Sequence, residues 1–447
     1  MIKKAFPLII TAILLFLSAC QNKLPEPIEL NEYVIGDVNT IVIDRDYVQS
    51  YYAGLFMAVE EINKAGGVNG IPLKVETKSD YGSHREAYIK ADYLVKEKNA
   101  IILSGTSFPQ TTLGVARYAQ ENQVPFVATG TSIESIITGS HVSDYVFRLK
   151  EGYNLHMKAL AEEIIKNKSM KSLVIVTYSS GEAVQNSEEF KRIIHASRPD
   201  IKFVQDVYLA SQKGVFDSVS RDILYSFTTG VVILLDGPDI FDVMKDIQIK
   251  RASVGKSVYL MMGGEPEWIK SLLSLTPKDW VVTGFPWYSI NTEQNKAFFT
   301  KYQNKYKKAK PVHSSYVGYI TGYIIADALR ISRPVKNDVK NRDRLAKAMG
   351  SASFNSPIGL IKMRSDHQSN MGTYIGLLKP YDAKVKGSKK VRPGIRMYDS
   401  VYVSADKLLV EPKVVNKIRE KQIKNNKKLE KKSRVIPKKE SSSVENN

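Results

Sequence analysis

The amino-acid sequence predicts an α/β protein with parallel sheets, and three observations support this fold class. At 447 residues, the chain is long enough for two or three domains of roughly 100–200 residues each. Its 43% hydrophobic content, 27 glycines and single cysteine exclude collagenous, disulfide-rich and wholly disordered proteins. Short apolar runs alternate with amphipathic stretches along most of the chain, and this alternation is typical of βαβ units.

The first twenty residues have the pattern of an export signal. Lys3 and Lys4 precede an apolar run over residues 5–17, and Ser18, Ala19 and Cys20 follow it. The run is shorter than the roughly 20 apolar residues that span a bilayer, so a signal peptide over residues 1–19 is expected.

The same segment resembles a bacterial lipoprotein signal, which implies that Cys20 receives the lipids and becomes the new N-terminus. An ordinary secretory signal with a chance cysteine is the alternative, but the only cysteine of the chain lies where lipidation requires one. The expected location is therefore the cell envelope, with the protein lipid-anchored to a membrane and facing the periplasm or extracellular space. A linker is expected over residues 20–32.

Six buried strands are predicted along the body of the chain, with amphipathic helices between them. The helix over residues 51–64, for example, places Leu55, Ala58 and Ile62 on one face at three- and four-residue spacing. Ligands of open α/β sheets bind beyond the carboxyl ends of the strands. The predicted strands are 71–77, 100–103, 125–128, 173–177, 230–235 and 258–262.

A more specific signal lies in residues 58–70 (AVEEINKAGGVNG), where a helix ends at a glycine pair and turns into a strand. As a whole this string resembles the first helix and turn of the type I periplasmic solute-binding proteins of ABC transporters, the branched-chain amino acid binding family. The resemblance covers about residues 33–378. It continues, in order, through residues 104–107 (SGTS), 116–125, 145–148 (YVFR), 263–265 (GGE) and 354–361 (FNSPIGLI).

The resemblance implies two doubly wound α/β lobes, joined by three hinge crossings, that close on a small molecule. The crossings are expected near residues 147–151, 283–287 and 354–361. The expected division of the chain follows: lobe one over 33–150 and 288–353, lobe two over 151–282 and 362–380, a basic extension over 381–412 and a disordered basic tail over 413–447.

One side of the ligand site is expected in residues 104–112 (SGTSFPQTT), which run from a strand end into a helix. The free N–H groups of a helix N-terminus favour an anion such as a carboxylate. Ser107, Phe108 and Thr111 are the candidate contacts of this loop. Ser107 is also expected to be the helix N-cap and Pro109 the first-turn proline, and capping alone would account for both.

Two further segments are expected to line this side of the site. The loop 129–132 (TGTS) supplies Thr131 and Ser132, although an ordinary strand-to-helix turn explains it equally well. Tyr47 lies where the resemblance implies an aromatic ring against the ligand side chain, with a surface tyrosine as the alternative. The charged residues around Tyr47 depart from the usual glycine-rich loop of the family, which leaves the identity of the ligand open.

The opposite side of the site is expected to carry carboxylates. Glu265 follows a strand and a glycine pair, and the resemblance implies that this carboxylate pairs with a ligand ammonium through a charge-assisted hydrogen bond. Asp236 ends another strand of the same lobe and is a second candidate acceptor. A solvated turn acid is the alternative for each.

No catalytic chemistry is predicted. The sequence has no Gly-x-Ser-x-Gly elbow, no His-Glu-x-x-His motif and no Walker phosphate loop. The six histidines are scattered without metal-ligand spacing, so neither a metal nor a cofactor is expected. Each is interpreted as a surface or internally hydrogen-bonded residue, and His367 as structural.

The net charge of +19 is concentrated at the C-terminal end. Residues 413–447 contain ten lysines and two arginines against four glutamates. Because the apolar residues there make no helical stripe, disorder or a frayed helix is expected. Attraction to anionic envelope polymers or lipid headgroups and a purely solvated tail are the two interpretations, while export disfavours nucleic acid as a partner.

The expected function is that of a lipid-anchored solute-binding protein. It captures a small polar solute, an amino acid or a related amide, and delivers it to an ABC permease. The alternative is a non-transport envelope lipoprotein that uses the same fold as a sensor or a protein-interaction scaffold.

Overall fold

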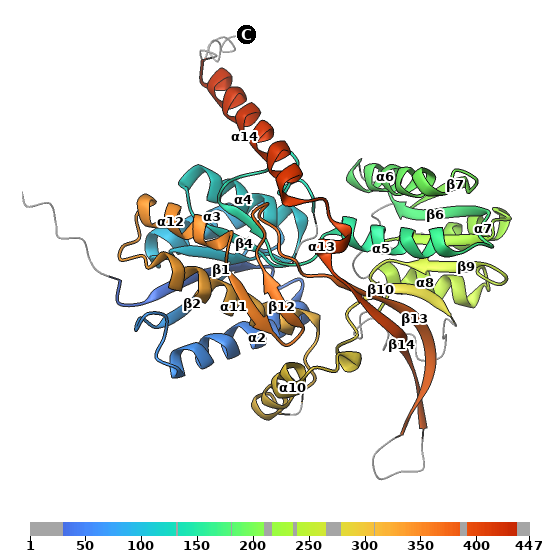
Figure 1. The fold of residues 1–447 in the computed structure, drawn as a ribbon, viewed down its shortest axis with the longest axis horizontal. Helices are drawn as coiled ribbons and strands as arrows, with labels where there is room; N and C mark the ends of the chain where they lie inside the picture. The colour runs from blue at the N-terminus through green and yellow to red at the C-terminus, as the bar shows by residue number, and fades with distance from the viewer. Residues whose placement is uncertain are drawn as a thin grey trace, which may run out of the picture.

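The computed structural model describes residues 30–435 except 131–132, 180, 210–216, 236–238, 265–278, 308 and 385–390. Two α/β lobes, each with its own sheet, lie side by side, with the N-terminal third of the chain in one and the middle third in the other (Figure 1). The predicted signal peptide, Cys20 and all but the last residues of the linker lie outside the described residues.

Lobe one is built on a five-stranded, fully parallel sheet in the order β2-β1-β3-β4-β5. Alternate residues of β1, an inner strand, face opposite sides of the sheet, because side chains of a strand alternate. Tyr33 and Ile35 of β1 join one apolar core, and Val34 and Val38 join another. The strands are β1 (Tyr33–Asn39), β2 (Leu73–Ser79), β3 (Ile102–Gly105), β4 (Phe126–Ala128) and β5 (Val146–Arg148).

Helices cover both faces of this sheet. Helices α3 (His84–Glu97) and α4 (Pro109–Asn122) supply the core on one face. Helices α2 (Arg45–Lys64) and α11 (His313–Ser332) cover the other. Helices α10 (Glu293–Lys305) and α12 (Val339–Met349) flank α11 along the chain.

Glycines allow α2 and α11 to pack at very short range. A Cβ on Gly54 would lie 1.9 Å from the carbonyl oxygen of Ser315, and one on Gly318 would lie 2.0 Å from that of Tyr51. Since Cβ atoms never approach oxygen so closely, both positions require glycine. This contact joins residues about 260 positions apart and holds the late helix α11 in lobe one.

Lobe two contains a seven-stranded sheet in the order β14-β13-β10-β9-β8-β6-β7. Its strands β6 to β10 are parallel, and β13 and β14 add antiparallel pairings at one edge. The strands are β6 (Ser172–Tyr178), β7 (Lys202–Leu209), β8 (Gly230–Leu234), β9 (Ser257–Leu260), β10 (Trp280–Gly284), β13 (Thr373–Lys384) and β14 (Val391–Val403). The helices are α5 (Tyr153–Lys166), α6 (Gly181–Ser197), α7 (Asp217–Tyr225) and α8 (Asp239–Ile249).

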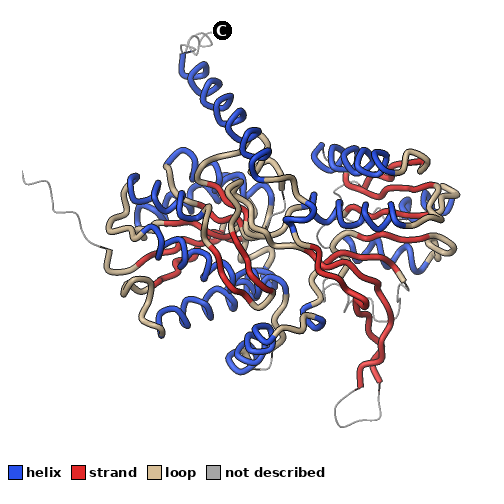
Figure 2. The backbone as a smooth tube through the Cα atoms, in the orientation of Figure 1, coloured by secondary structure: helices blue, strands red, loops and turns tan. Residues whose placement is uncertain are grey.

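The hairpin of β13 and β14 corrects the predicted end of lobe two at residue 380. Residues 381–412 are not a simple extension, because β14 pairs along its length with β13 and thereby joins the sheet. Figure 2 shows the two strands projecting beyond the rest of lobe two. The alternating sequence of β14 favours a strand, but only the pairing with β13 places it in this lobe.

The third crossing also differs from the prediction. Residues 354–361 form most of a small hairpin, β11 (Ser353–Ser356) and β12 (Gly359–Lys362), which packs on lobe one. Phe354 stacks on Tyr323 of α11 with 4.0 Å between ring centroids. The chain therefore passes to lobe two later, between β12 and the start of β13 at Thr373.

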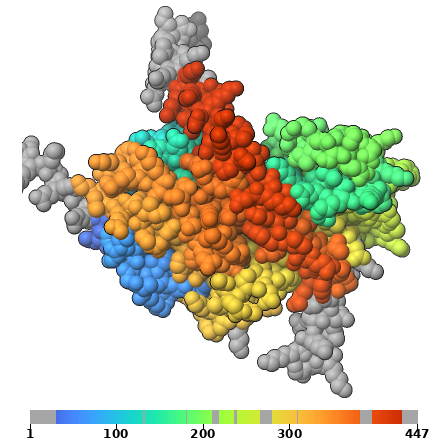
Figure 3. All heavy atoms as spheres, in the orientation of Figure 1, coloured from blue at the N-terminus to red at the C-terminus, as the bar shows by residue number. Residues whose placement is uncertain are grey.

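The basic tail forms a helix over its described part, so of the two expectations, disorder or a frayed helix, disorder is wrong there. Helix α14 (Pro412–Val435) begins against lobe one and projects outward from it (Figure 3). Val415, Arg419, Gln422 and Asn426 lie at helical spacing and face lobe one, with Val415 and Arg419 buried. This stripe is mostly polar, so the pattern of apolar residues alone does not predict it.

Arg419 provides the main polar attachment of α14. Its guanidinium donates to the carbonyl oxygens of Ile137 at 3.0 Å and Ser143 at 2.8 Å. Burial lowers the pKa of Arg419 to about 10, so it remains charged at neutral pH. Among the described residues, no helix is both long and apolar enough to cross a membrane.

Candidate functional site

Three strands of lobe one end side by side, where the sequence predicts the ligand site. Strands β1, β3 and β4 end at Asn39, Gly105 and Ala128. Gly105 has φ +110°, and a Cβ there would lie 2.4 Å from the carbonyl oxygen of Val38, so the turn after β3 requires glycine. The loops that follow these strands lie along one edge of the sheet, as the rule for open α/β sheets requires.

Tyr47 and Ser107 come together at this edge. The Tyr47 hydroxyl, in the first turn of α2, donates to the carbonyl oxygen of Thr129 at 3.2 Å. The Ser107 hydroxyl donates to Asn39 Oδ1 at 3.1 Å. Gly130 lies between them, because its added Cβ would be 2.9 Å from the Ser107 Cα and 3.1 Å from the Tyr47 hydroxyl.

The predicted capping role of Ser107 is wrong. Helix α4 begins at Pro109, so Phe108 is the N-cap, and no side chain caps the helix. The Ser107 hydroxyl is engaged by Asn39 instead, and Pro109 occupies the first turn as expected. The Thr111 hydroxyl donates back to the carbonyl oxygen of Phe108 at 3.0 Å, which turns it toward its own helix.

A buried carboxylate, Asp37, organises the floor beneath these residues. It accepts hydrogen bonds from Ser104 Oγ at 2.6 Å, Asn39 Nδ2 at 2.7 Å and the Tyr51 hydroxyl at 3.0 Å. Burial raises the pKa of Asp37 to about 6 although these donors oppose the shift. The carboxyl is thus mainly ionised at neutral pH, and its negative charge lies under the candidate site.

Asp37 also fixes which way the Ser107 hydroxyl points. An ionised carboxylate can only accept, so the Asn39 amide turns its NH₂ toward Asp37 and its oxygen toward Ser107. The Ser107 hydroxyl then donates its proton to Asn39 Oδ1, and its oxygen can accept a hydrogen bond from a donor group of a ligand. A ligand carboxylate at this edge would instead be bound by backbone N–H groups or a cationic side chain.

Four of the predicted site residues lie outside the described residues: Thr131, Ser132, Asp236 and Glu265. The residue just before each of these gaps is described. Gly264 donates its N–H to the carbonyl oxygen of Thr283 at 2.9 Å, which places the residue before Glu265 next to the end of β10.

A buried charge cluster lies at the hinge and was not predicted from the sequence. The two carboxylate oxygens of Glu151, in the first crossing, each lie 3.5 Å from an imidazole Nε2, one of His156 on α5 and one of His313 on α11. His156 Nδ1 lies 3.0 Å from Thr283 Oγ1, and His313 stacks on Phe285 of the second crossing. The cluster therefore joins both lobes with two of the crossings.

The pKa values of Glu151 and His313 are both lowered in this cluster, for different reasons. Burial alone would raise the pKa of Glu151, but His313 and His156 hold it well below its usual range. Burial lowers the pKa of His313 to about 4 although Glu151 opposes the shift. At neutral pH the carboxylate is charged and His313 is neutral.

Arg148 joins the first and third crossings. Its guanidinium, 1% exposed, donates to the carbonyl oxygen of Ile133 at 2.9 Å, to Glu134 Oε1 at 2.8 Å and to Gln368 Oε1 at 2.8 Å. The neighbouring His367 stacks on Phe147 with 4.2 Å between ring centroids. This packing is in keeping with the structural interpretation of His367.

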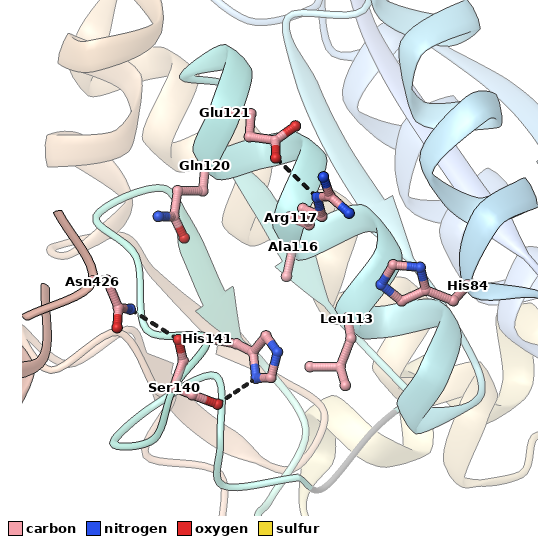
Figure 4. Close-up of a pocket in the computed structure, with 9 residues that line it drawn as sticks. All are labelled: His84, Leu113, Ala116, Arg117, Gln120, Glu121, Ser140, His141 and Asn426. Carbon is pink, nitrogen blue, oxygen red and sulfur yellow. Dashed lines mark hydrogen bonds and ion pairs between the residues drawn. The ribbon is translucent and has the colours of Figure 1, made fainter. Parts of the chain in front are cut away.

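Two hollows lie away from the expected ligand site. One, of about 420 Å³, is lined by His84 of α3, residues of α4, Ser140, His141 and Asn426 of α14. Figure 4 shows Asn426 bonded to Ser140, the contact that closes α14 over this hollow. The other lies over α6 and β7. The described residues contain no cluster of histidine, cysteine or acidic side chains able to hold a metal.

Comparison with known proteins identifies the family. The family model "Periplasmic binding protein" matches residues 45–383, and no curated protein sequence matches the chain significantly. Among solved structures, a solute-binding protein from Rhodopseudomonas palustris BisB5 in complex with 3,4-dihydroxybenzoic acid is similar to it, with a TM-score of 0.69 and 15% identity over 84% of this chain and 98% of that one.

A second similar structure is the branched-chain amino acid transporter substrate-binding protein LivJ from Streptococcus pneumoniae, in complex with isoleucine. Its TM-score is 0.65, with 18% identity over 83% of this chain and 99% of that one. At such identities the structures establish the fold, and the family model establishes the relationship. The chain with its two α/β lobes therefore belongs to the periplasmic binding proteins, a family of substrate-binding proteins and not of enzymes, and it has the type I fold of the solved solute-binding proteins.

Proposed function

We propose that this protein is a lipid-anchored, extracytoplasmic solute-binding protein that delivers its solute to an ABC permease. The solute is a small polar molecule, an amino acid or a related amide, bound between the lobes. The observation that carries the proposal is the meeting of Tyr47, Ser107 and the Thr129 carbonyl at the carboxyl edge of the lobe-one sheet. An aromatic ring, a hydroxyl and backbone polar groups there suit a small amphiphilic ligand.

Glu265 and Asp236 are proposed as the acceptors that lobe two supplies. The position of Gly264 beside Thr283 supports this role for Glu265, since it puts the start of that loop at the hinge side of lobe two. An ammonium group held between Glu265 and the lone pairs of Ser107 would have an acceptor on each lobe. Such a ligand would favour the closed arrangement of the lobes.

A ligand screen tests the proposal. Thermal shift and calorimetry on the mature protein should detect at least one amino acid, amide or small peptide. Because some similar structures hold benzoate or 3,4-dihydroxybenzoic acid, aromatic acids belong in the same screen. Glu265→Ala should weaken binding of the amino-acid ligand, while Glu97→Ala, an exposed residue at the end of α3, should not.

Two results would contradict this site. One is the absence of binding to every amino acid, amide and small peptide in the screen. The other is unchanged affinity in Glu265→Ala, which would remove the carboxylate from the site model while leaving solute binding itself intact.

The lipid anchor is proposed at Cys20, on the strength of the signal-like residues before it. Metabolic labelling with palmitate should mark the wild-type protein and not Cys20→Ala. The variant should also move from the membrane fraction to the soluble fraction. Equal labelling of both proteins would contradict lipidation at this residue.

Helix α14 supports the second candidate function, that of an envelope interaction protein. Within the helix, ten lysines and arginines stand against two glutamates, and Lys413, Lys417, Lys421 and Lys424 are exposed. A fixed basic helix suits an anionic envelope polymer better than a disordered tail does, because less chain is ordered on binding. A pull-down that depends on α14 and ignores small solutes would favour this function over transport.

A further inference from the structure

Two basic residues of the first crossing have very different surroundings. Arg148 is bound on several sides by Ile133, Glu134 and Gln368. Lys150, two residues later, is only 8% exposed, yet no hydrogen bond or ion pair joins its ammonium to a described residue. The Lys150 Nζ atom is not fully enclosed. The aliphatic stem is therefore buried, and the ammonium at its tip reaches solvent.

Lys150 lies at the same sheet edge as the candidate ligand site. The N–H of Leu149 donates to the carbonyl oxygen of Ala128 at 3.0 Å, so the crossing continues alongside the end of β4. The next residue of that loop, Thr129, accepts the Tyr47 hydroxyl. Lys150 therefore follows β5 where β1, β3 and β4 also end.

The charges that face Lys150 come from α2 and from the hinge cluster. Burial raises the pKa of Asp44, just before α2, while Lys150 pulls it down and Asp46 pushes it up. Lys150 also helps to hold the pKa of Glu151 below its usual range and adds to the lowered pKa of His313. The lysine is thus near two carboxylates.

Neither carboxylate is in contact with the lysine. Glu151 is held between two imidazoles at 3.5 Å, and no ion pair of Lys150 within 4.0 Å occurs among the described residues. The buried stem restricts where the ammonium can move, and it leaves the tip in solvent at the sheet edge without a contacting anion among the described residues. An anion that entered beside it would meet a positioned cation that forms no ion pair with a described residue.

We propose that the Lys150 ammonium binds the carboxylate of the solute, at the hinge end of the site between the lobes. This inference rests on the proposed function and adds to its site the residue that holds the carboxylate of the solute. The N-terminus of α4, a helix of 14 residues, lies along the same edge and supplies backbone N–H groups and a favourable dipole. Ser107, whose lone pairs are free for a donor, then meets another part of the solute.

Matched pairs of probes test the proposal on the mature protein. Calorimetry is performed with L-isoleucine against L-isoleucinamide, and with benzoate against benzamide. Wild-type protein should bind at least one carboxylate and bind its amide less tightly. Lys150→Met should weaken binding of that carboxylate about 10- to 100-fold, the range for one charge-assisted hydrogen bond, and leave binding of the amide unchanged.

A control and a stability measurement separate binding from folding. Lys158→Met is the control, because that lysine lies on α5 and donates to the carbonyl oxygen of Leu408; it should bind both probes as wild type does. The melting temperature of Lys150→Met should be unchanged, since the ammonium tip reaches solvent and its removal breaks no hydrogen bond or ion pair with a described residue. Lys150→Gln serves as a second variant if the methionine packs badly.

The possible results distinguish the inference from the function on which it rests. Wild-type affinity of Lys150→Met for the carboxylate, or a wild-type protein that binds only neutral or cationic solutes, would overturn the role of Lys150 and leave solute binding standing. No binding of any solute by the wild type would overturn both. Large losses of melting temperature in both Lys150 variants would show a structural cation and would also overturn the inference.

Discussion

The hinge cluster of Glu151, His156 and His313 makes the stability of this protein sensitive to acid, and a substitution of His313 tests this prediction. His313 is 7% exposed, and burial lowers its pKa from 6.5 to about 4. As the pH falls below 6.5, the unfolded chain binds a proton at this histidine, whereas the folded chain does not until about pH 4. Stability is therefore present above pH 6.5 and is lost as the pH falls toward 4.

The size of the effect follows from the two pKa values. Between pH 7.5 and pH 5.0, this single group should lower the free energy of unfolding by about 2 kcal/mol. His313→Gln removes the titration, so the variant should lose about 2 kcal/mol less than wild type over the same interval. Other titrating groups contribute to both proteins and largely cancel in the difference.

Urea denaturation at the two pH values, followed by tryptophan fluorescence, measures this difference. Trp287 reports on the hinge, because it begins the short helix (Trp287–Ser289) that follows the second crossing. His84→Gln is the control, since His84 is exposed, and it should behave as wild type does. If His313→Gln and wild type lose the same stability between pH 7.5 and pH 5.0, the assignment of a buried, neutral His313 is refuted.

Three further substitutions test the packing that holds the lobes and α14 in place. Arg419→Ala removes both hydrogen bonds to the Ile137 and Ser143 carbonyls and should weaken the attachment of α14 to lobe one by about 2–3 kcal/mol. Amide hydrogen exchange in α14 should become faster in this variant, and should not change in Lys421→Ala, where the lysine is exposed. Gly318→Ala puts a Cβ 2.0 Å from the Tyr51 carbonyl and should lower the free energy of unfolding by about 1–3 kcal/mol, whereas Gly181→Ala, with open space around it, should change it by under about 0.5 kcal/mol. Arg148→Met leaves Glu134 and Gln368 without their buried cation and should lower the free energy of unfolding in urea by about 3–5 kcal/mol. Arg117→Met is the control, because its ion pair is exposed. A loss for Arg148→Met no larger than that of the control would argue against a structural role for Arg148.

The order of strands and helices was largely predictable, because the spacing of apolar residues and the positions of glycine and proline are local properties of the sequence. The six predicted strands correspond to β2, β3, β4, β6, β8 and β9 within a few residues. Strand β8 reads as a continuous apolar run because a central parallel strand is buried on both faces. The glycine pair at Gly66 and Gly67 ends α2 with positive φ angles, as its sequence predicts.

The errors occurred where a distant partner decides the outcome. Ser107 is a good N-cap by its sequence, but Asn39, 68 residues earlier, engages its hydroxyl. Arg419 lies in a segment that reads as a solvated tail, yet two carbonyl groups nearly 280 residues away bury it. Residues 354–361 suit a linker as well as a hairpin, and stacking of Phe354 on Tyr323 fixes the hairpin on lobe one.

The sequence by itself determined the α/β class, the family and the loops that meet at the carboxyl edge of the lobe-one sheet, because these depend on periodicity and on motifs of neighbouring residues. Only the tertiary structure showed that Glu151, His156 and His313 form one cluster, and that the Lys150 side chain is mostly buried with no contacting anion among the described residues. These residues come from different elements, so their distances are set by how the crossings bring the lobes together. Charge interactions act through space rather than along the chain, and only the folded molecule decides which of them are satisfied.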